Sequence, residues 1–416
     1  MDKTINRPRG TQDIYGENAN MYNYIFDKFS QVALLSGFNL IKTPMFESIE
    51  TFVRSVGETS DIVKKEFYNF VDKGGREIAL RPEGTASVIR CVVEDKLLYT
   101  SPLPLMFYYY GSMFRYERPQ SKRLREFNQF GVEIIGTNSI YDDFGVIKFV
   151  AECLNSINIK NITIKINNLG SFNSRFKWID ELKKYFKPFK SQLTELSQER
   201  LASNPTRILD DKVDGIKDFV QNAPKISQFL TTSEKDEFTN LLILLEKFNI
   251  NCVIDETLVR GLDYYTNTVF EIVTQDDLAI GGGGRYGKLV EEFGGEDTSC
   301  IGMAFGIDRI INYIKENKIK TDFVNTNVAI VFASLTENAN TKVLDYMAQC
   351  RSRGISCVAN LSLNKLAKVF NYAEKIGAKY VAIIGEAELN NNTITYKDIE
   401  KKIQKTVSLN EFFKLI

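Results

Sequence analysis

Apolar side chains recur every three or four positions between about residues 18 and 36, which is the first clear pattern along the chain. The side chains that set this spacing are Tyr22, Ile25, Phe26, Phe29, Val32 and Ala33. The spacing predicts an amphipathic helix that ends near Gly37. The following segment, FNLIKTPMFE, predicts a short strand that is interrupted by Pro44.

Runs rich in aromatic and β-branched residues continue to about residue 168 and predict several strands. The clearest runs are LMFYYYGSMFRY, NQFGVEIIG and NITIKIN. Predicted helices lie among them, and one of these begins near Thr85. Because strands and helices do not alternate strictly, the pattern favours an α+β domain with an antiparallel sheet over a doubly wound fold.

Residues from about 170 to 255 show helical spacing and no convincing strand. The clearest helices are FKWIDELKKYF and SEKDEFTNLLILLEKF. In the second helix, Ser233 is the predicted N-cap and Asp236 completes a capping box. The apolar stripe of that helix consists of Phe238, Leu241, Leu242, Leu245 and Phe248. Since strands are predicted to resume at Leu258 and Val269, we interpret this part as a helical insertion.

Beyond Thr321 the pattern changes to short apolar strands separated by helices. The strands are NVAIVFAS, GISCVAN and KYVAIIG, and they predict a small α/β domain with a partly parallel sheet. Residues 325–416 contain 12 Lys and Arg against 8 Asp and Glu, whereas the whole chain has 53 of each kind. This modest excess suits a surface that faces RNA, and an ordinary solvated surface explains it nearly as well.

Composition limits the chemistry. The 416 residues suffice for two or three domains, and neither an export signal nor a membrane-spanning stretch is visible, so we expect a cytoplasmic protein. The six cysteines are scattered, which indicates reduced thiols and no metal site. The chain has no histidine, which excludes Ser-His-Asp and Cys-His catalysis. What remains is acid–base chemistry by other groups, or a nucleophile that is already ionised.

The segment YERPQSKRLR lies between two predicted strands and predicts the loop of a long hairpin. Four arginines could converge there on one anion, namely Arg115, Arg118, Arg123 and Arg125. Guanidinium suits phosphate because its planar fork binds two oxygens at once and keeps its charge. A solvent-exposed hairpin with a basic tip is an equally good interpretation of this segment alone.

Alternation along the second strand of the hairpin predicts a polar pocket. It puts Gln129, Gly131 and Glu133 on one face of the strand. The opposite face would carry Asn128, Phe130, Val132 and Ile134. Polar side chains that share a face with a glycine leave room for a small molecule.

Three further segments carry candidate residues. Glu83 and Thr85 lie at a turn into a helix, where they could hold an ammonium group or merely cap the helix. Arg260 lies in an otherwise apolar predicted strand, beside a glycine and before paired tyrosines. The segment GMAFGIDRI predicts a helix that opens with Gly302 and Gly306 and presents Arg309 to a phosphate or a base.

The run GGGGRYGKL nearly matches the phosphate-binding loop G-x-x-x-x-G-K-[ST] from Gly282 onward. Leu289 stands where that loop needs a hydroxyl group, and the preceding residues are a poor strand. We interpret the run as a chance match whose glycines let the backbone approach a ligand or another strand.

Six segments together resemble the histidyl-tRNA synthetases, a family of class II aminoacyl-tRNA synthetases. They are RPRGTQDIYG, LRPEGTA, the hairpin from FRYERPQ to QFGVEIIG, LVRGLDYYTNTVFEIV, GGGGRY and IGMAFGIDR, in the order and spacing of that family. The resemblance covers essentially the whole chain. RGLDYY is particularly specific to the family, whereas the hairpin arginines and the Gly-Arg helix are shared by class II enzymes generally.

The resemblance implies a fold and an activity. The fold would be an antiparallel class II catalytic domain at residues 1–168 and 256–322, a helical insertion at 169–255, and a C-terminal α/β anticodon-binding domain at 325–416. The activity would be ATP-dependent ligation of L-histidine to its tRNA through a histidyl-adenylate, with transfer to the 3′-terminal adenosine. The first helix and the strand around Pro44 would form the interface of a homodimer.

The resemblance also implies roles for single residues. Residues that would hold the α-ammonium group of histidine are Glu83, Thr85 and Gln129. Those that would read the imidazole are Glu133 and Tyr265, with Tyr264 adjacent. ATP would be bound by Arg115 at the α-phosphate, by Arg123 and Arg309 at the outer phosphates and the adenine side, and by Phe127 stacked on adenine. Arg260 would stabilise the carboxylate and α-phosphate in the transition state, and Mg²⁺ would be bound mainly through the ATP phosphates.

Three positions depart from the family pattern. Asn128 replaces a histidine before the hairpin glutamine, and by alternation it faces away from the pocket. Lys122 replaces a loop glycine, which puts contacts with the tRNA acceptor end in doubt. GGRYGKL lacks the aspartate of the family's GGRYDGL, so the role of that aspartate is in doubt.

Two other interpretations stay open at this point. One is a paralogue that does not charge tRNA and instead regulates histidine biosynthesis by binding a partner enzyme. The other is an unrelated ATP-binding module with a basic RNA-facing surface. The composition fits the synthetase, since an amino-acid carboxylate is already ionised at neutral pH and needs no general base to attack ATP.

Overall fold

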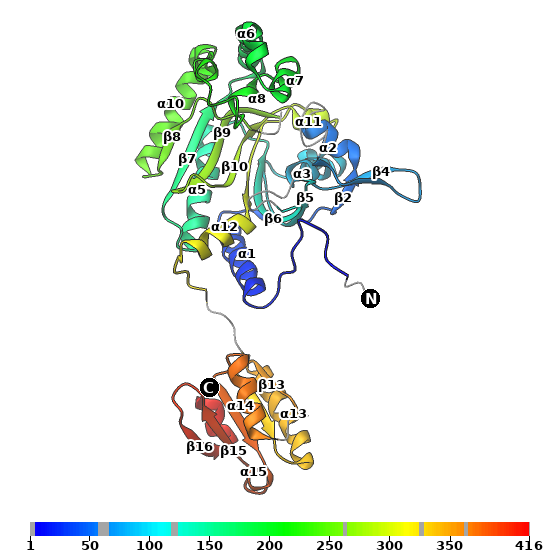
Figure 1. Cartoon of the computed structure of the whole chain (residues 1–416), viewed down its shortest axis with the longest axis vertical. Coiled ribbons are helices and arrows are strands. Elements are labelled where there is room, and N and C mark those ends of the chain that lie inside the picture. The colour runs from blue at the N-terminus through cyan, green and yellow to red at the C-terminus, as the bar shows by residue number, and fades with distance from the viewer. Residues whose placement is uncertain are drawn as a thin grey trace. The chain divides into compact units, whose positions relative to one another are not determined.

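The computed structural model describes residues 5–56, 66–117, 124–260, 264–323, 328–361 and 365–415. The chain forms two compact units, Met1–Phe323 and Val324–Ile416 (Figure 1). Each unit has its own sheet and its own hydrophobic core. The predicted α+β unit followed by a small α/β unit is therefore confirmed.

An eight-stranded sheet organises the first unit, with strand order β1-β5-β6-β11-β10-β9-β7-β8. Its strands are β1 (Asn39–Leu40), β5 (Leu105–Phe114), β6 (Glu126–Ile135), β7 (Ile162–Asn168), β8 (Cys252–Ile254), β9 (Tyr265–Thr274), β10 (Ala279–Tyr286) and β11 (Cys300–Gly306). The six strands from β5 to β7 pair antiparallel, and only the outermost pairs, β1 with β5 and β7 with β8, are parallel. The predicted antiparallel sheet is confirmed.

One face of this sheet is covered by α1 (Glu17–Leu35), α5 (Ile140–Ser156), α10 (Thr232–Lys247) and α12 (Ile307–Glu316). The predicted first helix is confirmed, because Tyr22, Ile25, Phe29 and Ala33 are buried in the core under the sheet. Gly37 follows the helix end with φ +86°, a conformation that glycine adopts without strain. This face holds the chain together and leaves the other face of the sheet for α3 (Thr85–Glu94) and a pocket.

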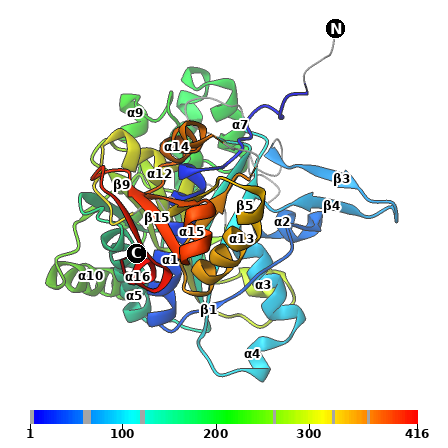
Figure 2. The ribbon, with the colours of Figure 1, turned by 90° about the horizontal axis from the view of Figure 1, so that it is seen from below.

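The predicted strand around Pro44 is two strands in different sheets. β1 belongs to the large sheet, whereas β2 (Phe46–Ser48) pairs with β4 (Glu77–Leu80), which in turn pairs with β3 (Asn69–Val71). The hairpin of β3 and β4 extends from the body of the unit (Figure 2). α2 (Ile49–Val56) follows β2, and α4 (Leu97–Thr100) follows α3.

Helices lie between β7 and β8. They are α6 (Phe172–Phe186), α7 (Glu195–Ser203), α8 (Thr206–Leu209), α9 (Asp218–Gln221) and α10, with 3₁₀ turns at Lys187–Gln192 and Ile226–Gln228. Their common core includes Trp178, Leu182 and Phe186 of α6. The expectation of no strand before residue 255 is wrong at its end, because β8 pairs with β7 there.

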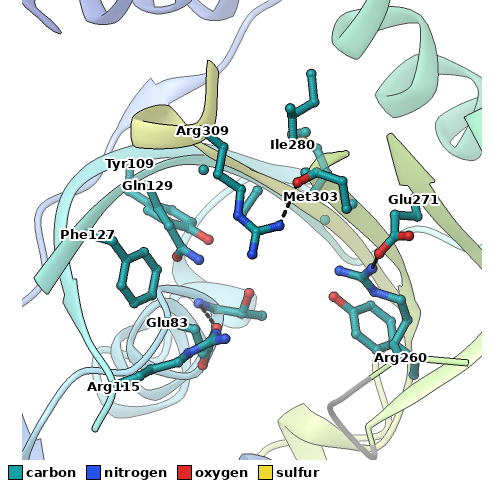
Figure 3. A pocket seen from close by; sticks show the side chains of 18 of the residues that line it. Glu83, Tyr109, Arg115, Phe127, Gln129, Arg260, Glu271, Ile280, Met303 and Arg309 are labelled. Carbon is teal, nitrogen blue, oxygen red and sulfur yellow. Dashed lines mark hydrogen bonds and ion pairs between the residues drawn. The ribbon is translucent and has the colours of Figure 1, made fainter. Parts of the chain in front are cut away.

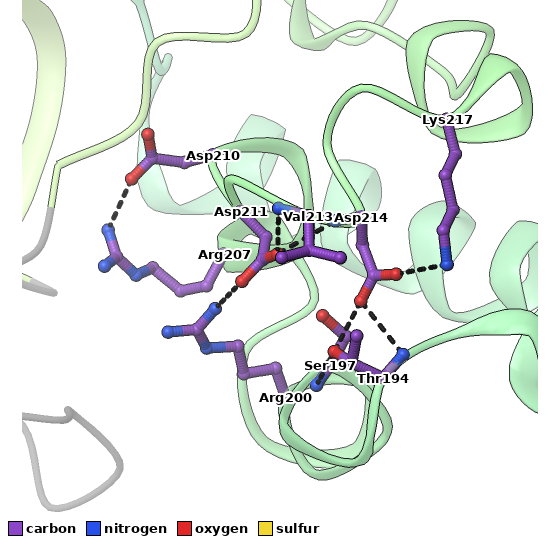
Figure 4. A network of polar contacts seen from close by, with 9 residues as sticks. All are labelled: Thr194, Ser197, Arg200, Arg207, Asp210, Asp211, Val213, Asp214 and Lys217. Atoms are coloured by element: carbon purple, nitrogen blue, oxygen red, sulfur yellow. Dashed lines mark hydrogen bonds and ion pairs between the residues drawn. The ribbon is translucent and has the colours of Figure 1, made fainter.

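Asp214 holds the loop between α8 and α9 (Figure 4). Its carboxylate accepts hydrogen bonds from the backbone N–H (3.0 Å) and hydroxyl (2.6 Å) of Thr194 and from Lys217 (2.6 Å). Although burial raises the pKa of Asp214, these bonds outweigh it and lower the pKa below its ordinary value. The loop is therefore fixed by an ionised carboxylate at neutral pH.

The predicted cap of α10 is wrong. Thr231 is the N-cap, and Glu234 completes the capping box instead of Ser233 and Asp236. Glu234 also accepts hydrogen bonds from the backbone N–H of Ser171 (2.7 Å) and the hydroxyl of Ser174 (2.8 Å), so it joins α10 to α6. Because Glu234 is held by these bonds to Ser171 and Ser174, Thr231 becomes the N-cap in place of the neighbouring Ser233.

The second unit has a five-stranded sheet of order β13-β12-β14-β15-β16. Its strands are β12 (Ile330–Ser334), β13 (Cys357–Ala359), β14 (Tyr380–Ile384), β15 (Thr393–Asp398) and β16 (Gln404–Ser408). The first three in the order pair parallel and the others antiparallel, which confirms the partly parallel sheet. α13 (Glu337–Ser352) and α16 (Leu409–Leu415) pack on one face, α14 (Leu366–Lys375) packs on the other, and α15 (Glu386–Asn391) joins β14 to β15.

Among the described residues, no helix is long and apolar enough to cross a membrane.

Candidate active site

A pocket lies on the face of the large sheet opposite α1, between the hairpin β5–β6, the N-terminal turn of α3 and the start of β9 (Figure 3). Ten of the eleven residues predicted for the site line it: Glu83, Thr85, Arg115, Phe127, Gln129, Glu133, Arg260, Tyr264, Tyr265 and Arg309. The eleventh, Arg123, lies outside the described residues. Segments far apart in the sequence thus meet at one cavity.

Alternation along β6 is confirmed. Gln129 and Glu133 line the pocket, whereas Phe130, Val132 and Ile134 are buried in the core on the other face. The predicted separation of a polar and an apolar face therefore follows from the period of two in a strand.

Three hydroxyl groups converge on Glu133 in the pocket. Its Oε1 accepts hydrogen bonds from Thr85 Oγ1 (2.7 Å) and, more weakly, from the Tyr109 hydroxyl (3.4 Å), and its Oε2 accepts one from the Tyr286 hydroxyl (2.6 Å). Burial raises the pKa of Glu133 to about 8, although the bonds from Tyr286 and Thr85 lower it. Among the described residues, this buried carboxyl group bonds to hydroxyls and to no cation, and it changes charge near pH 8.

Gly302 makes room for Glu133. The two residues are direct cross-strand partners in β11 and β6, and a Cβ at position 302 would overlap the glutamate carboxylate. The prediction that GMAFGIDRI opens a helix is therefore wrong at Gly302, which lies in the strand Cys300–Gly306. It is right at Gly306, which is the N-cap of α12. Gly302 serves close approach within a sheet and not a helix start.

Glu83 both caps a helix and lines the pocket, so the two interpretations of this residue are compatible. Its carboxylate accepts hydrogen bonds from the backbone N–H groups of Thr85 (2.6 Å) and Ala86 (2.8 Å) in the first turn of α3. Burial raises the pKa of Glu83, and these bonds lower it. Arg115 is anchored beside it by a 2.9 Å hydrogen bond from Nε to the carbonyl of Pro82.

The four hairpin arginines do not all converge. Arg115 lines the pocket, and its guanidinium lies 5.3 Å from the centre of the Phe127 ring. Arg125 lies outside the pocket lining, since it donates to the carbonyl of Glu117 (3.2 Å) and lies over the Tyr116 ring at 3.9 Å. Arg118 and Arg123 fall outside the described residues. The expected convergence is wrong for Arg125, because this side chain packs within the hairpin.

Arg260 lies in the segment before β9 and not in a strand, so the prediction of a strand around Leu258 is wrong. Its Nη1 donates a 3.0 Å hydrogen bond to Oε1 of Glu271. Arg309, in the first turn of α12, donates from Nη1 to the carbonyl of Ala279 at 2.6 Å. Figure 3 shows the guanidinium groups of Arg115, Arg260 and Arg309 directed into the same cavity.

Five polar lining residues were not predicted: Tyr109, Glu117, Glu271, Tyr286 and Asp308. A signal existed for Glu271, which is a single charge inside the apolar run TVFEIV. Tyr286 ends the glycine run, and its role depends on a contact with Glu133 that sequence spacing does not reveal.

The glycine run Gly281–Gly284 lies in β10 between β9 and β11 and forms no phosphate loop. Because the run is a paired strand, the interpretation of its match to the phosphate loop as chance is confirmed. Gly281 and Gly282 line the pocket. Because glycines have no side chain, this part of the pocket wall leaves space for a ligand.

An antiparallel sheet whose hairpin and strand-to-helix turn direct arginines into one pocket defines a class II aminoacyl-tRNA synthetase. Residues 10–310 match the family described as histidyl-tRNA synthetase, and residues 325–416 match the anticodon binding domain. The chain therefore belongs to the histidyl-tRNA synthetase family, and the resemblance in its sequence motifs is confirmed.

The similarity to known relatives extends over nearly the whole chain. A histidine–tRNA ligase of Malacoplasma penetrans (strain HF-2) is 44% identical over 98% of this chain and 96% of the relative. One from Ureaplasma urealyticum serovar 10 is 41% identical over 98% of both chains. The crystal structure of apo S. aureus histidyl-tRNA synthetase is 32% identical, covers 99% of both chains and has a TM-score of 0.83. These matches exclude the unrelated ATP-binding module.

Proposed function

We propose that this chain ligates L-histidine to its cognate tRNA in two steps, through a histidyl-adenylate. The observation that carries the proposal is one pocket that combines a buried carboxyl–hydroxyl cluster around Glu133 with three guanidinium groups. The cluster suits a small ring with a donor and an acceptor, and the guanidinium groups suit phosphates.

In the first step, the carboxylate of histidine attacks the α-phosphorus of ATP and pyrophosphate leaves. The nucleophile is already ionised, so the protein has to position the reactants and stabilise charge but does not need a base. In the second step, a hydroxyl of the 3′-terminal adenosine of tRNA attacks the adenylate carbonyl. A chain without histidine can perform both steps.

Histidine is held at the Glu133 end of the pocket in this proposal. Glu83, Thr85 and Gln129 bind the α-ammonium group, and Glu133 and Tyr265, with Tyr264 adjacent, read the imidazole. Gln129 supports this assignment, because its buried Oε1 has no hydrogen-bond partner among the described residues and can accept from an ammonium group.

ATP occupies the guanidinium side. Arg115 binds the α-phosphate, Phe127 stacks on adenine, and Arg309 and Arg123 bind the outer phosphates and the adenine side. Arg260 stabilises the charge that develops in the transition state. Its Nε supports this role, since it is buried and has no hydrogen-bond partner among the described residues.

Mg²⁺ would be bound mainly through the ATP phosphates, whose charge it neutralises. Among the described residues, no group of three or more Cys, Asp or Glu side chains could hold a metal ion. The carboxylates of Glu83, Glu133 and Glu271 already accept bonds from amide, hydroxyl and guanidinium donors, respectively. This suits an ion that arrives with the nucleotide.

The larger assembly is part of the proposal. Residues 1–168 with 256–322 form the catalytic domain, 169–255 the insertion and 325–416 the domain that binds the anticodon. A homodimer forms through α1 and the strands around Pro44, where Leu34, Leu35, Met45 and Phe46 are more than half exposed. The enzyme acts in the cytoplasm, where tRNA is charged for translation.

Pyrophosphate exchange measured with each of the twenty amino acids tests the activity. Exchange that depends strictly on histidine supports the proposal. Absence of exchange with every amino acid contradicts it and favours the paralogue that does not charge tRNA. Charging of the histidine tRNA then tests the second step.

A further inference from the structure

The carboxylate of Glu271 holds Arg260 at the side of the pocket. The ion pair of Arg260 Nη1 with Glu271 Oε1 spans 3.0 Å, and the two side chains keep 22% and 28% of their surface exposed (Figure 3). Packing alone therefore does not fix the guanidinium. The hydrogen bond that the guanidinium donates to Glu271 has to supply the orientation.

The sheet determines where this carboxylate lies. Glu271 of β9 is the direct cross-strand partner of Gly282 of β10, and a Cβ at Gly282 would lie 2.8 Å from Nη2 of Arg260. The guanidinium thus extends over the bare backbone of β10, with Glu271 beside it. Arg260 itself comes from an irregular segment, so β9 and β10 provide the rigid part of the arrangement.

Glu271 accepts a hydrogen bond from Nη1 of Arg260. Nε is buried and has no partner among the described residues, so a donor remains for a substrate. A transition state gains most from donors that are already oriented, because no reorganisation is then needed as charge develops.

We propose that Glu271 is the positioning residue of Arg260: its carboxylate holds the guanidinium in the orientation that the transition state of histidine activation requires. The inference rests on the proposed function, since it concerns the step in which Arg260 acts. Glu271 itself touches no reacting atom in this role.

The insertion offers a matched control. The charge of Asp210, which follows α8, also acts on Arg260, but its carboxylate bonds to Arg207 at 3.1 Å (Figure 4). Asp210→Asn therefore removes one negative charge from the surroundings of Arg260 and leaves the Glu271 bond intact. Glu271→Gln removes a charge together with the charged acceptor.

The first measurement is histidine-dependent pyrophosphate exchange at saturating ATP. Glu271→Gln should lower kcat by on the order of 100-fold, as expected for a misplaced catalytic group, with the KM for histidine changed less than about threefold. Glu271→Asp, which keeps the charge on a shorter side chain, should recover part of the rate. Asp210→Asn should stay within about threefold of the wild type. A Glu271→Gln enzyme with wild-type kcat would overturn the inference.

The second measurement is a double-mutant cycle with Arg260→Met. If Glu271 acts through Arg260, Glu271→Gln should lower kcat less than about twofold in the Arg260→Met background. An equal cost in both backgrounds, together with a matching loss in Tm, would show a merely structural role and overturn the inference. Wild-type protein without any exchange would overturn the proposed function first, so the two failures are distinguishable.

Discussion

Gly302 lies directly across the sheet from Glu133, and the glutamate carboxylate fills the space that a Cβ of residue 302 would need. Since β6 and β11 are fixed by pairing on both sides, the backbone cannot move away from an added methyl group. The group that would have to move is the Glu133 carboxylate, which three hydroxyls hold in the pocket.

Gly302→Ala should therefore displace Glu133 and raise the KM for histidine in pyrophosphate exchange by on the order of 100-fold. Gly287→Ala is the control, because among the described residues no atom beyond its two chain neighbours lies within 4 Å of a Cβ at that position. Equal kinetics for the two variants would contradict this account of the site.

Glu133→Gln should reduce exchange with histidine sharply and relax the choice of amino acid. The amide keeps the size of the side chain but cannot ionise, so it cannot become the anionic acceptor that an imidazole N–H favours. Tyr265→Phe should reduce exchange with histidine less than Glu133→Gln does. Measurements with histidine and its two N-methyl isomers would show which nitrogen each residue reads. If Glu133→Gln weakened ATP binding and left selectivity unchanged, the assignment of Glu133 to the imidazole would be wrong.

The stability of the ligand-free protein should depend on pH through Glu133. The pKa of Glu133 is about 8 in the folded protein and near 4.5 in the unfolded chain, so between these values only the folded protein retains the proton. The free energy of unfolding should thus fall as the pH rises and level off above about pH 8. Because one unit of pKa corresponds to about 1.4 kcal/mol, this group accounts for on the order of a few kcal/mol of the decline.

Glu133→Gln should make the profile of Tm between pH 5 and 8.5 flatter, at constant ionic strength. Glu83, whose pKa burial also raises, should leave a residual slope in the same direction. A variant profile parallel to that of the wild type would show that Glu133 does not carry the proton.

Asp308 should matter for stability and for ATP binding. Its carboxylate accepts hydrogen bonds from Tyr22 (2.5 Å), Gln12 (2.8 Å) and the backbone N–H of Asn128 (2.6 Å), which joins the N-terminal segment and α1 to β6 beside Arg309. In Asp308→Asn, the new amide N–H group would point at one of these donors and leave it without an acceptor. We therefore expect the free energy of unfolding to fall by about 1–3 kcal/mol and the KM for ATP to rise.

Urea denaturation and the exchange assay would measure the two effects of Asp308→Asn. Asp277→Asn is a suitable control, because the Asp277 side chain is 76% exposed and its ion pair with Lys165 (2.6 Å) should contribute less than about 1 kcal/mol. Wild-type stability of Asp308→Asn would contradict the role of this carboxylate as a junction.

The proposed dimer predicts that Leu35→Lys combined with Phe46→Lys yields monomers in analytical ultracentrifugation. The wild-type side chains are 82% and 57% exposed in the single chain, and a partner would cover them. Phe176→Lys is the control, since Phe176 is 67% exposed on α6, away from the proposed interface. A wild-type protein that is already monomeric at micromolar concentration would contradict the dimer.

The sequence predicted the site best where local periodicity decides the structure. Alternation alone separated Gln129 and Glu133 from the core residues of β6, because a strand has a period of two. Sequence reasoning failed where a residue far along the chain determines the local structure. Gly302 was assigned to a helix, although it lies in a strand and pairs with Glu133. The cap of α10 failed for the same reason, since Glu234 is held by Ser171 of another helix. Spacing along one segment contains no information about such partners.

The order of strands also has a consequence during synthesis of the protein. β6 pairs with β5 on one side and β11 on the other, but β6 ends at Ile135 and β11 begins only at Cys300. At roughly 5–20 residues per second, a ribosome needs roughly ten to thirty seconds to cover that interval. Throughout this time the nascent hairpin presents an unpaired edge, which is a template for aggregation. The yield of folded enzyme should therefore depend on chaperones that shield this edge until β11 leaves the ribosome.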